Sequence, residues 1–388
     1  MLKVAFVSCF FSHHQLSFSD AMVAMEGVEY YFIETTPMSE ERKKLGWGLN
    51  KPKYVLPAYE SAETERRCQK IINEADFVII GSADDKYLEQ RHREKKLVFR
   101  YSERFYRNGC PAWQVPLRFL KNYHRFNRHK NDYLLCASAY TSSDAAVTKS
   151  FVGKSYRWGY FTELSEQSAD SLIAGKQENG KVSLLWAGRF LPLKHPEAAV
   201  LLAEQLKQQK LPFSLTIIGS GEMENELRGM IENKDLSDCV TMTGSMQAGQ
   251  VRGYMEKSDI FLFTSDFHEG WGAVLNESMN SACAVVASHA IGSAPFLIND
   301  RENGFIYKNG DIEQLTDIVV KLIKDQELRT RLGRNAYRTI VEEWNGTVAA
   351  ERLVALYGDI KESGKSSRYS HGPCSPAPII RNEWYRND

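Results

Sequence analysis

The chain has 388 residues, a length that suits two domains better than one. Hydrophobic residues make up 43% and charged residues 25% of it, which is ordinary for a globular protein and excludes a disordered or fibrous one. Lys plus Arg and Asp plus Glu both number 49, so the net charge indicates no polyanionic partner.

The seven cysteines are scattered, and no pair has the C-x-x-C spacing. This distribution argues against a disulfide framework or a zinc site and favours a reducing cytoplasm. The first residues, MLKVAFVSCFF, lack the features of a signal peptide, and no apolar run approaches the roughly 18 residues of a membrane span. We therefore expect a cytoplasmic protein that at most binds a membrane surface.

Short apolar, β-rich runs alternate with helix-length segments along the chain. Runs this apolar are typical of parallel strands that crossover helices bury on both faces. The polar segment 162–181 lacks aromatic residues, divides the runs into two series, and is interpreted as a linker. The predicted strands are 3–8, 30–34, 76–82, 97–102 and 133–138 in the first series, and 182–188, 213–219, 239–244, 259–265 and 284–288 in the second.

This alternation predicts an α/β protein with two doubly wound, Rossmann-like domains that face a central cleft. We expect the first domain at residues 1–165 and the second at 166–345. Residues 346–388 are expected to form a C-terminal helix that returns to the first domain, followed by a tail.

Loops in the second half carry side chains suited to a phosphorylated, polyhydroxy ligand. Ligands of such sheets bind where strands end and loops lead into helices. Arg189 and Lys194 follow the run that ends at residue 188 and could neutralise a diphosphate. Glu269 and Glu277 flank a Gly-Trp-Gly turn after the run that ends at residue 265.

The glycines of this turn allow a close approach of the backbone to a ligand, and a helix is expected to start at about Ala273. Its first N–H groups would bind a phosphate. Glu277, one turn into the helix, would accept hydrogen bonds from ribose hydroxyls, and Glu269 would lie on the sugar side. The predicted donor-binding residues are Gly270, Trp271, Gly272, Ala273, Val274, Glu277 and Gly244.

Five ordered blocks between residues 182 and 345 resemble the donor-binding half of glycosyltransferase family 4. The blocks read GRFLPLK, LTIIGSGE, VTMTG, SDIFLFTSDFHEGWGAVLNESMNSACAVVAS and NDRENGFIY. The Glu-x7-Glu signature of the family falls on Glu269 and Glu277, and its basic pair falls on Arg189 and Lys194. The first half, with VSCFFSHHQLSFSDAM and LVFRYSERF, resembles a branch that serves bacterial capsule and exopolysaccharide synthesis.

The resemblance implies the GT-B fold and a retaining hexosyl transfer from a nucleotide diphosphate sugar, with UDP the commonest carrier. It implies Glu269, Arg189 and Lys194 as catalytic residues, and neither a metal nor a cofactor. The acceptor would be a hydroxyl of a glycan or lipid-diphosphate-linked molecule in cell-surface polysaccharide synthesis. Two alternatives remain: a nucleotide-sugar epimerase on the same fold, and a non-catalytic subunit that binds sugar nucleotides.

Three residues of the first half are candidates for the acceptor side of the cleft. His13 and His14 follow the first predicted strand, and Glu103 follows the strand that ends at residue 102. The histidines are as often a capping feature, and Glu103 with Arg104 could equally form a surface ion pair.

A basic stripe marks the segment from residue 115 to 130. Its cations recur at i, i+3, i+7 and i+10, beside an adjacent apolar and aromatic face. This pattern is typical of a helix in a membrane interface, and we expect peripheral binding to the anionic inner leaflet. The alternative is an aromatic face packed inside the domain; no nucleic-acid fold signature accompanies the stripe, so no nucleic-acid partner is expected. The cations are Arg118, Lys121, Arg125 and Arg128, and the adjacent face is Val115, Phe119, Tyr123 and Phe126.

Overall fold

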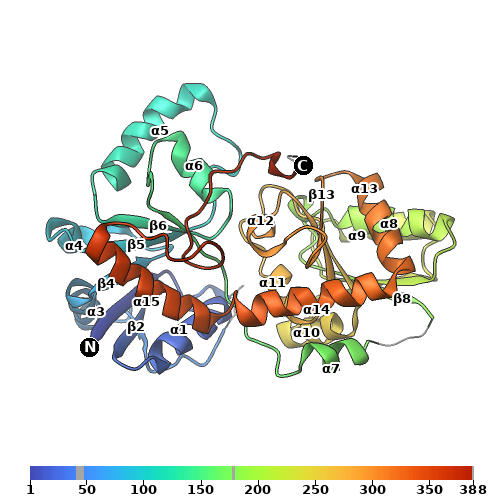
Figure 1. The fold of residues 1–388 in the computed structure, drawn as a ribbon, viewed down its shortest axis with the longest axis horizontal. Helices are drawn as coiled ribbons and strands as arrows, with labels where there is room; N and C mark the ends of the chain where they lie inside the picture. The colour runs from blue at the N-terminus through green and yellow to red at the C-terminus, as the bar shows by residue number, and fades with distance from the viewer. Residues whose placement is uncertain (41–47, 177–179, 387–388) are drawn as a thin grey trace. The chain divides into compact units, whose positions relative to one another are not determined.

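The computed structural model describes residues 1–40, 48–176 and 180–386, and the chain divides into two compact units (Figure 1). The first unit comprises Met1–Glu163 and Trp344–Asn382, and the second comprises Leu164–Glu343 with the residues that follow Asn382. The boundaries predicted from the sequence, after residues 165 and 345, each lie two residues beyond the observed ones, which follow Glu163 and Glu343. Nothing in the sequence indicated that the end of the tail belongs with the second unit.

A seven-stranded parallel sheet forms the centre of the first unit, in the order β3-β2-β1-β4-β5-β6-β7. The strand order reverses direction between β1 and β4, and this reversal is the topological switch point where open α/β sheets bind ligands. The strands are β1 (Leu2–Ser8), β2 (Val28–Glu34), β3 (Val55–Pro57), β4 (Phe77–Ile80), β5 (Leu97–Ser102), β6 (Asp132–Cys136) and β7 (Ser155–Arg157).

Helices cover both faces of this sheet. Successive residues of a strand point to opposite faces, and apolar side chains on both faces need to be buried. Val7 and Val78 share a core with Ile72 of α3, whereas Phe6 and Phe77 pack against Phe18 of α1 and a tyrosine of α15. Both faces are therefore apolar, as the near-continuous hydrophobic runs predicted. The helical segments are α1 (His13–Ala24), α3 (Ala62–Glu74), η2 (Asp85–Leu88), α4 (Glu89–Arg93), η3 (Ala112–Gln114), α5 (Val115–Asn122), the π-helix η4 (Tyr123–Asn127), α6 (Thr141–Val147) and α15 (Gly346–Ser363).

The second unit is built on a six-stranded parallel sheet in the order β10-β9-β8-β11-β12-β13. Its switch point lies between β8 and β11, which pair directly. The loops that follow these two strands therefore meet at one edge of the sheet. The strands are β8 (Val182–Ala187), β9 (Phe213–Ile218), β10 (Val240–Gly244), β11 (Ile260–Phe263), β12 (Ala284–Ser288) and β13 (Phe305–Tyr307).

Helices also cover both faces of the second sheet. Leu184 and Leu262 belong to one core with residues of α8, α9, α13 and the first turns of α14, and α10, α11 and α14 also contact the strands. Among the described residues, we find no helix that combines the length and the low polarity needed to cross a membrane. The helical segments are α7 (Ala169–Ala174), η5 (Pro192–Lys194), α8 (Pro196–Gln208), α9 (Glu224–Asn233), α10 (Ala248–Lys257), α11 (Val274–Asn280), α12 (Ala294–Leu297), α13 (Ile312–Lys324), α14 (Gln326–Glu342) and η6 (Trp384–Arg386).

All ten strands predicted from the sequence are present, and the prediction of two Rossmann-like parallel-sheet domains is confirmed. The segment 162–181 is more than a linker: α7 lies within it and packs on α14, where the Tyr337 hydroxyl donates to the Gln167 carbonyl (2.8 Å). A break in the C-terminal helical region occurs at Asn345, which caps α15 through a bond from the Val348 amide (2.9 Å).

Candidate functional site

The loops after β8 and β11 are joined by hydrogen bonds that fix the position of Lys194. The indole of Trp186 donates to the Thr264 hydroxyl (2.8 Å), which in turn donates to the Lys194 carbonyl (2.6 Å). The Asp266 amide donates to the Leu193 carbonyl (3.0 Å). The sheet topology and these bonds together hold the basic loop against the acidic one.

Lys194 and Glu269 form an ion pair between these two loops. Their side chains are only 17% and 12% exposed, and the Ser265 hydroxyl also donates to the Glu269 carboxylate (3.1 Å). The side chain of Arg189 is exposed at the start of the same basic loop. The structure therefore brings Lys194 and Glu269 together, and it leaves Arg189 exposed in the same loop as Lys194.

The Gly-Trp-Gly turn has one residue whose backbone only glycine adopts easily. Gly272 has φ +82°, and a Cβ atom there would lie 2.3 Å from the ring of Phe263. The side chain of Trp271 is fully buried and donates to the Asn276 side chain (2.8 Å). The predicted donor contact of Trp271 is thereby limited to its backbone, because the indole belongs to the core that supports the turn.

Gly272→Ala is expected to lower the free energy of unfolding by about 2 kcal/mol, because the left-handed backbone and the overlap with Phe263 both oppose a side chain. Urea unfolding monitored by circular dichroism measures it. Gly229→Ala is the matched control. It lies within α9 with open space around it, so the same change should stabilise the protein by roughly 0.5–1 kcal/mol. Equal effects of the two substitutions would contradict the strain at Gly272.

α11 begins at Val274 with Ala273 as its N-cap, within one residue of the predicted start, and is seven residues long. Glu277 lies in its first turn, and among the described residues no hydrogen-bond donor reaches its half-buried carboxylate. Burial raises the pKa of Glu277 to about 6, and the nearby Arg252 guanidinium opposes this shift. An acid held without a partner is typical of a binding site rather than of a structural ion pair.

Glycines allow the neighbouring loops to approach one another closely. A Cβ atom at Gly219 would lie 1.9 Å from the Gly188 carbonyl oxygen, and one at Gly221 would lie 2.5 Å from the Phe190 carbonyl oxygen. Gly244, which ends β10, has φ +79° and no heavy atom within 4 Å of where a Cβ would stand. The predicted role of Gly244 is compatible with this open position.

In the first unit, the candidate residues gather at the carboxyl ends of β1 and β5. The buried Glu34 carboxylate accepts from the Phe11 amide (2.8 Å) and so fixes the loop that leads to His13 and His14. The ring of His14 stacks on Tyr160 (5.0 Å between centroids), whose hydroxyl donates to Glu103 (2.6 Å). Tyr160, which the sequence did not single out, therefore joins the predicted His14 to the predicted Glu103.

Burial disfavours the charged form of both histidines. Burial lowers the pKa of His13, and burial with the adjacent His13 lowers the pKa of His14 to about 3. The proposed surface pair of Glu103 with Arg104 is wrong, because Glu103 pairs with Arg107 and Arg104 pairs with the buried Asp144 (2.9 Å).

The basic stripe is only partly as predicted. Arg118 donates to Gln114 and lies 4.4 Å from the ring centroid of Tyr106, while Arg125 forms an ion pair with Asp85 (2.7 Å). Phe126 is buried, against the prediction of an aromatic face at a membrane, because the helix changes to a π-helical turn after Asn122. Lys121 and Arg128 remain exposed.

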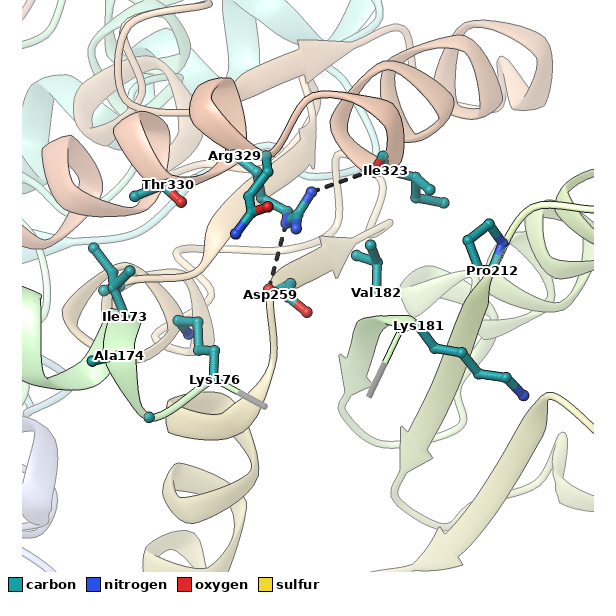
Figure 2. A pocket seen from close by; sticks show the side chains of 14 residues that line it. Ile173, Ala174, Lys176, Lys181, Val182, Pro212, Asp259, Ile323, Arg329 and Thr330 are labelled. Atoms are coloured by element: carbon teal, nitrogen blue, oxygen red, sulfur yellow. Dashed lines mark hydrogen bonds and ion pairs between the residues drawn. The ribbon is translucent and has the colours of Figure 1, made fainter. Parts of the chain in front are cut away.

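A cavity of about 730 Å³ lies at the opposite edge of the second sheet, where the strands begin (Figure 2). Its charged groups are engaged in the structure: Arg329 bonds to Asp259 (3.4 Å) and to the Leu322 carbonyl (2.6 Å), and Lys176 donates to the Ser258 carbonyl (2.5 Å). Ligands of parallel sheets bind at the other edge, so we assign these residues a structural role.

Two further residues of the second unit were missed by the sequence reasoning. Arg252 of α10 donates to the Glu277 carbonyl (2.9 Å), and Ser265 donates to Glu269. Arg252 stands outside the five blocks; Ser265 stands within one of them, and its position after a strand could have indicated it. The described residues include no group of three or more His, Cys, Asp or Glu placed to hold a metal ion, and metal independence stays a prediction.

The second unit of the chain is similar in sequence to known glycosyltransferases. Residues 170–339 match the family model of glycosyl transferases group 1. The amylovoran biosynthesis glycosyltransferase AmsK of Erwinia amylovora is 29% identical over 178 residues, 45% of this chain and 44% of AmsK. The alpha-D-kanosaminyltransferase of Streptomyces kanamyceticus is 26% identical over 177 residues, 46% of this chain and 45% of that protein. The chain thus spans about half the length of these curated relatives.

The fold comparison covers both units. The crystal structure of HepE from Anabaena in complex with UDP has a TM-score of 0.65 and 14% sequence identity, over 92% of this chain and 100% of HepE. The chain therefore has the GT-B fold, and the matched segment of its second unit resembles glycosyl transferases group 1.

Proposed function

We propose that this protein is a retaining glycosyltransferase of family 4 that moves a sugar from a nucleotide diphosphate sugar to an acceptor hydroxyl. The observation that carries the proposal is the arrangement of two acids around the turn before α11. Glu269 is paired with Lys194, whereas Glu277 has a raised pKa and no hydrogen-bond donor among the described residues. One acid thus accompanies a phosphate-binding cation, and the other is available to ligand hydroxyls.

Binding of the donor would exchange partners within this group. Lys194 would leave Glu269 for the diphosphate, joined by the exposed Arg189, and together they would stabilise the charge of the leaving diphosphate. Glu277 would accept from the ribose hydroxyls, and the released Glu269 would orient the sugar. α11 has only seven residues, so we assign most of the charge compensation to the two cations.

The transfer requires no group beyond these residues and the donor. The bond from the anomeric carbon to the diphosphate breaks, and a bond to the acceptor oxygen forms on the same face of the sugar. The acceptor proton passes to the leaving diphosphate, which takes both electrons of the broken bond. No metal or cofactor enters the scheme.

The donor and the pathway are proposed by analogy. HepE was crystallised with UDP, so UDP is the preferred carrier, and AmsK is named for amylovoran biosynthesis. We propose a glycan or lipid-diphosphate-linked acceptor for a capsule or exopolysaccharide, made in the cytoplasm at the inner leaflet. His13, His14 and Glu103 are the proposed acceptor residues, with Tyr160 holding His14 and Glu103 in place.

A nucleotide panel followed by a transfer assay tests the proposal. Thermal shift with UDP, GDP, ADP and dTDP identifies the carrier, and the matching sugar nucleotides are then incubated with and without a lipid-linked acceptor. Nucleotide release that depends on the acceptor is the expected result. Isomerised sugar without acceptor would indicate an epimerase, and binding without turnover would indicate a non-catalytic subunit.

A further inference from the structure

The helix α5, labelled in Figure 1, and the short helix η3 before it carry exposed apolar side chains. Trp113 is 73% exposed, Leu117 is 67% exposed and Leu120 is 56% exposed. The spacing of these three positions, i, i+4 and i+7, places them on one side of a helix. Tyr123, at the end of α5, is 47% exposed. Large apolar side chains gathered in this way mark a contact surface rather than scattered exposure.

The opposite side of α5 is already packed, so the apolar face is not left over from an incomplete core. Asn122 is buried and donates to the Tyr106 hydroxyl (3.0 Å) and to the Thr148 hydroxyl (2.9 Å). Phe126 packs on Phe151 (5.2 Å between centroids). The helix is anchored to its own unit through these residues, and its apolar face points outward.

The segment that carries this face holds charges of one sign. Residues 104–131 contain seven Lys or Arg and no Asp or Glu. Lys121 and Arg128 are exposed, and neither forms an ion pair with a carboxylate of the described residues. A second copy of the chain docked here by a two-fold axis would bring cations against cations. An anionic bilayer would meet both the charge and the apolar side chains.

We propose that this interfacial face, Trp113, Leu117, Leu120 and Tyr123 with Lys121 and Arg128, binds the surface of an anionic membrane. The apolar side chains enter the boundary between headgroups and acyl chains, and the cations contact anionic headgroups. The face differs from the stripe predicted from the sequence, since Arg118 and Arg125 are held by the protein and Phe126 is buried. The inference rests on the proposed function only for the presence of a membrane beside the acceptor.

Co-sedimentation with vesicles tests the face directly. The wild-type protein should pellet with vesicles that contain anionic phosphatidylglycerol, and should bind pure phosphatidylcholine at least tenfold more weakly. Lys121→Gln with Arg128→Gln should weaken binding by about fivefold per cation, since each cation near an anionic leaflet contributes about that factor. Trp113→Gln with Leu117→Gln should weaken it by more than tenfold, and high salt should not restore the loss.

Two matched variants control for exposure and charge. Ile379→Gln, at an apolar residue that is 71% exposed elsewhere in the first unit, should bind like wild type. Lys53→Gln with Lys308→Gln removes the same charge from other exposed sites and should also leave binding unchanged. Trp113→Phe should keep the affinity and lose the part of the tryptophan emission that brominated lipid quenches.

The proposal fails if the Trp113 and Leu117 variant pellets as wild type does. It also fails if sedimentation velocity shows that this variant dissociates an oligomer while wild type ignores vesicles, because the face would then join copies of the chain. UDP thermal shifts of all variants should equal that of wild type. A protein that binds UDP and not vesicles would overturn this inference alone, whereas vesicle binding without any nucleotide shift would overturn the donor site.

Discussion

Glu269→Ala is expected to reduce sugar transfer by about 100-fold or more while the affinity for free UDP stays the same or rises. The carboxylate pairs with Lys194 in the free protein, so its removal releases that cation for the diphosphate. The transfer rate falls because the sugar loses the acid that orients it, a loss of the size seen when one preorganised polar group is removed. Calorimetry with UDP and acceptor-dependent UDP release measure the two effects separately.

Lys194→Ala, unlike Glu269→Ala, should weaken the binding of free UDP. UDP affinity is expected to fall by roughly 1.5–3 kcal/mol, the contribution of a hydrogen bond to a charged group. The control is Glu204→Ala, which removes the acid of another half-buried ion pair, with Lys234 (2.6 Å), away from these loops. Glu204→Ala should change neither the affinity for UDP nor the rate of sugar transfer. If Glu269→Ala lost as much UDP affinity as Lys194→Ala, the two side chains would not have the roles assigned to them.

Glu277→Gln is expected to weaken UDP binding and at the same time to stabilise the ligand-free protein at neutral pH. Binding loses the charged acceptor of the ribose hydroxyls, again at roughly 1.5–3 kcal/mol. Stability rises because an ionised, half-buried carboxylate without a hydrogen-bond donor is unfavourable. The shift of the pKa of Glu277 from 4.5 to about 6 corresponds to about 2 kcal/mol.

The pH dependence of this stabilisation follows from the direction of the shift. Between pH 4.5 and about 6, the folded state holds a proton that the unfolded state has lost, so the wild-type free energy of unfolding falls as pH rises. Above about pH 6, the full cost is present. Glu277→Gln should therefore unfold at higher urea than wild type at pH 7.5 and at nearly the same urea at pH 4.5. The exposed Glu232→Gln should match wild type at both; an equal gain at both values would contradict the assignment.

The sequence predicted the strands at the centres of both sheets and one edge strand, β10, and missed the other three edge strands. β3, β7 and β13 have three residues each and lie at the ends of their sheets. A three-residue run is too short to show an apolar pattern, and an edge strand needs burial on fewer sides. The ten longer strands were visible because helices bury them on both faces.

The site was predictable to the extent that it depends on strand ends. Arg189, Lys194, Glu269 and Glu277 follow strands that parallel topology brings to one edge, so spacing along the chain was sufficient. The pairing of Lys194 with Glu269 in the free protein, and the burial of the Trp271 indole, depend on side-chain packing that no spacing rule contains. The predicted basic stripe over residues 115–130 was only partly right for a related reason. The helix becomes π-helical after Asn122, so a 3.6-residue period no longer applies there.

The return of α15 to the first unit sets the order in which the protein can be completed during synthesis. Leu353, Leu356 and Ile360 of α15 are buried, and its Tyr357 packs on Phe77 (4.9 Å between centroids). The tail then bridges the edge strand β7 at Pro376. Residues Met1–Glu163 therefore wait for Trp344–Asn382 to complete their unit, whereas Leu164–Glu343 is continuous and can fold before those later residues are made. A ribosome that stalls after Glu343 would release a chain with its second unit formed and the apolar side of α1 uncovered, a substrate for chaperones and proteases rather than a partly active enzyme.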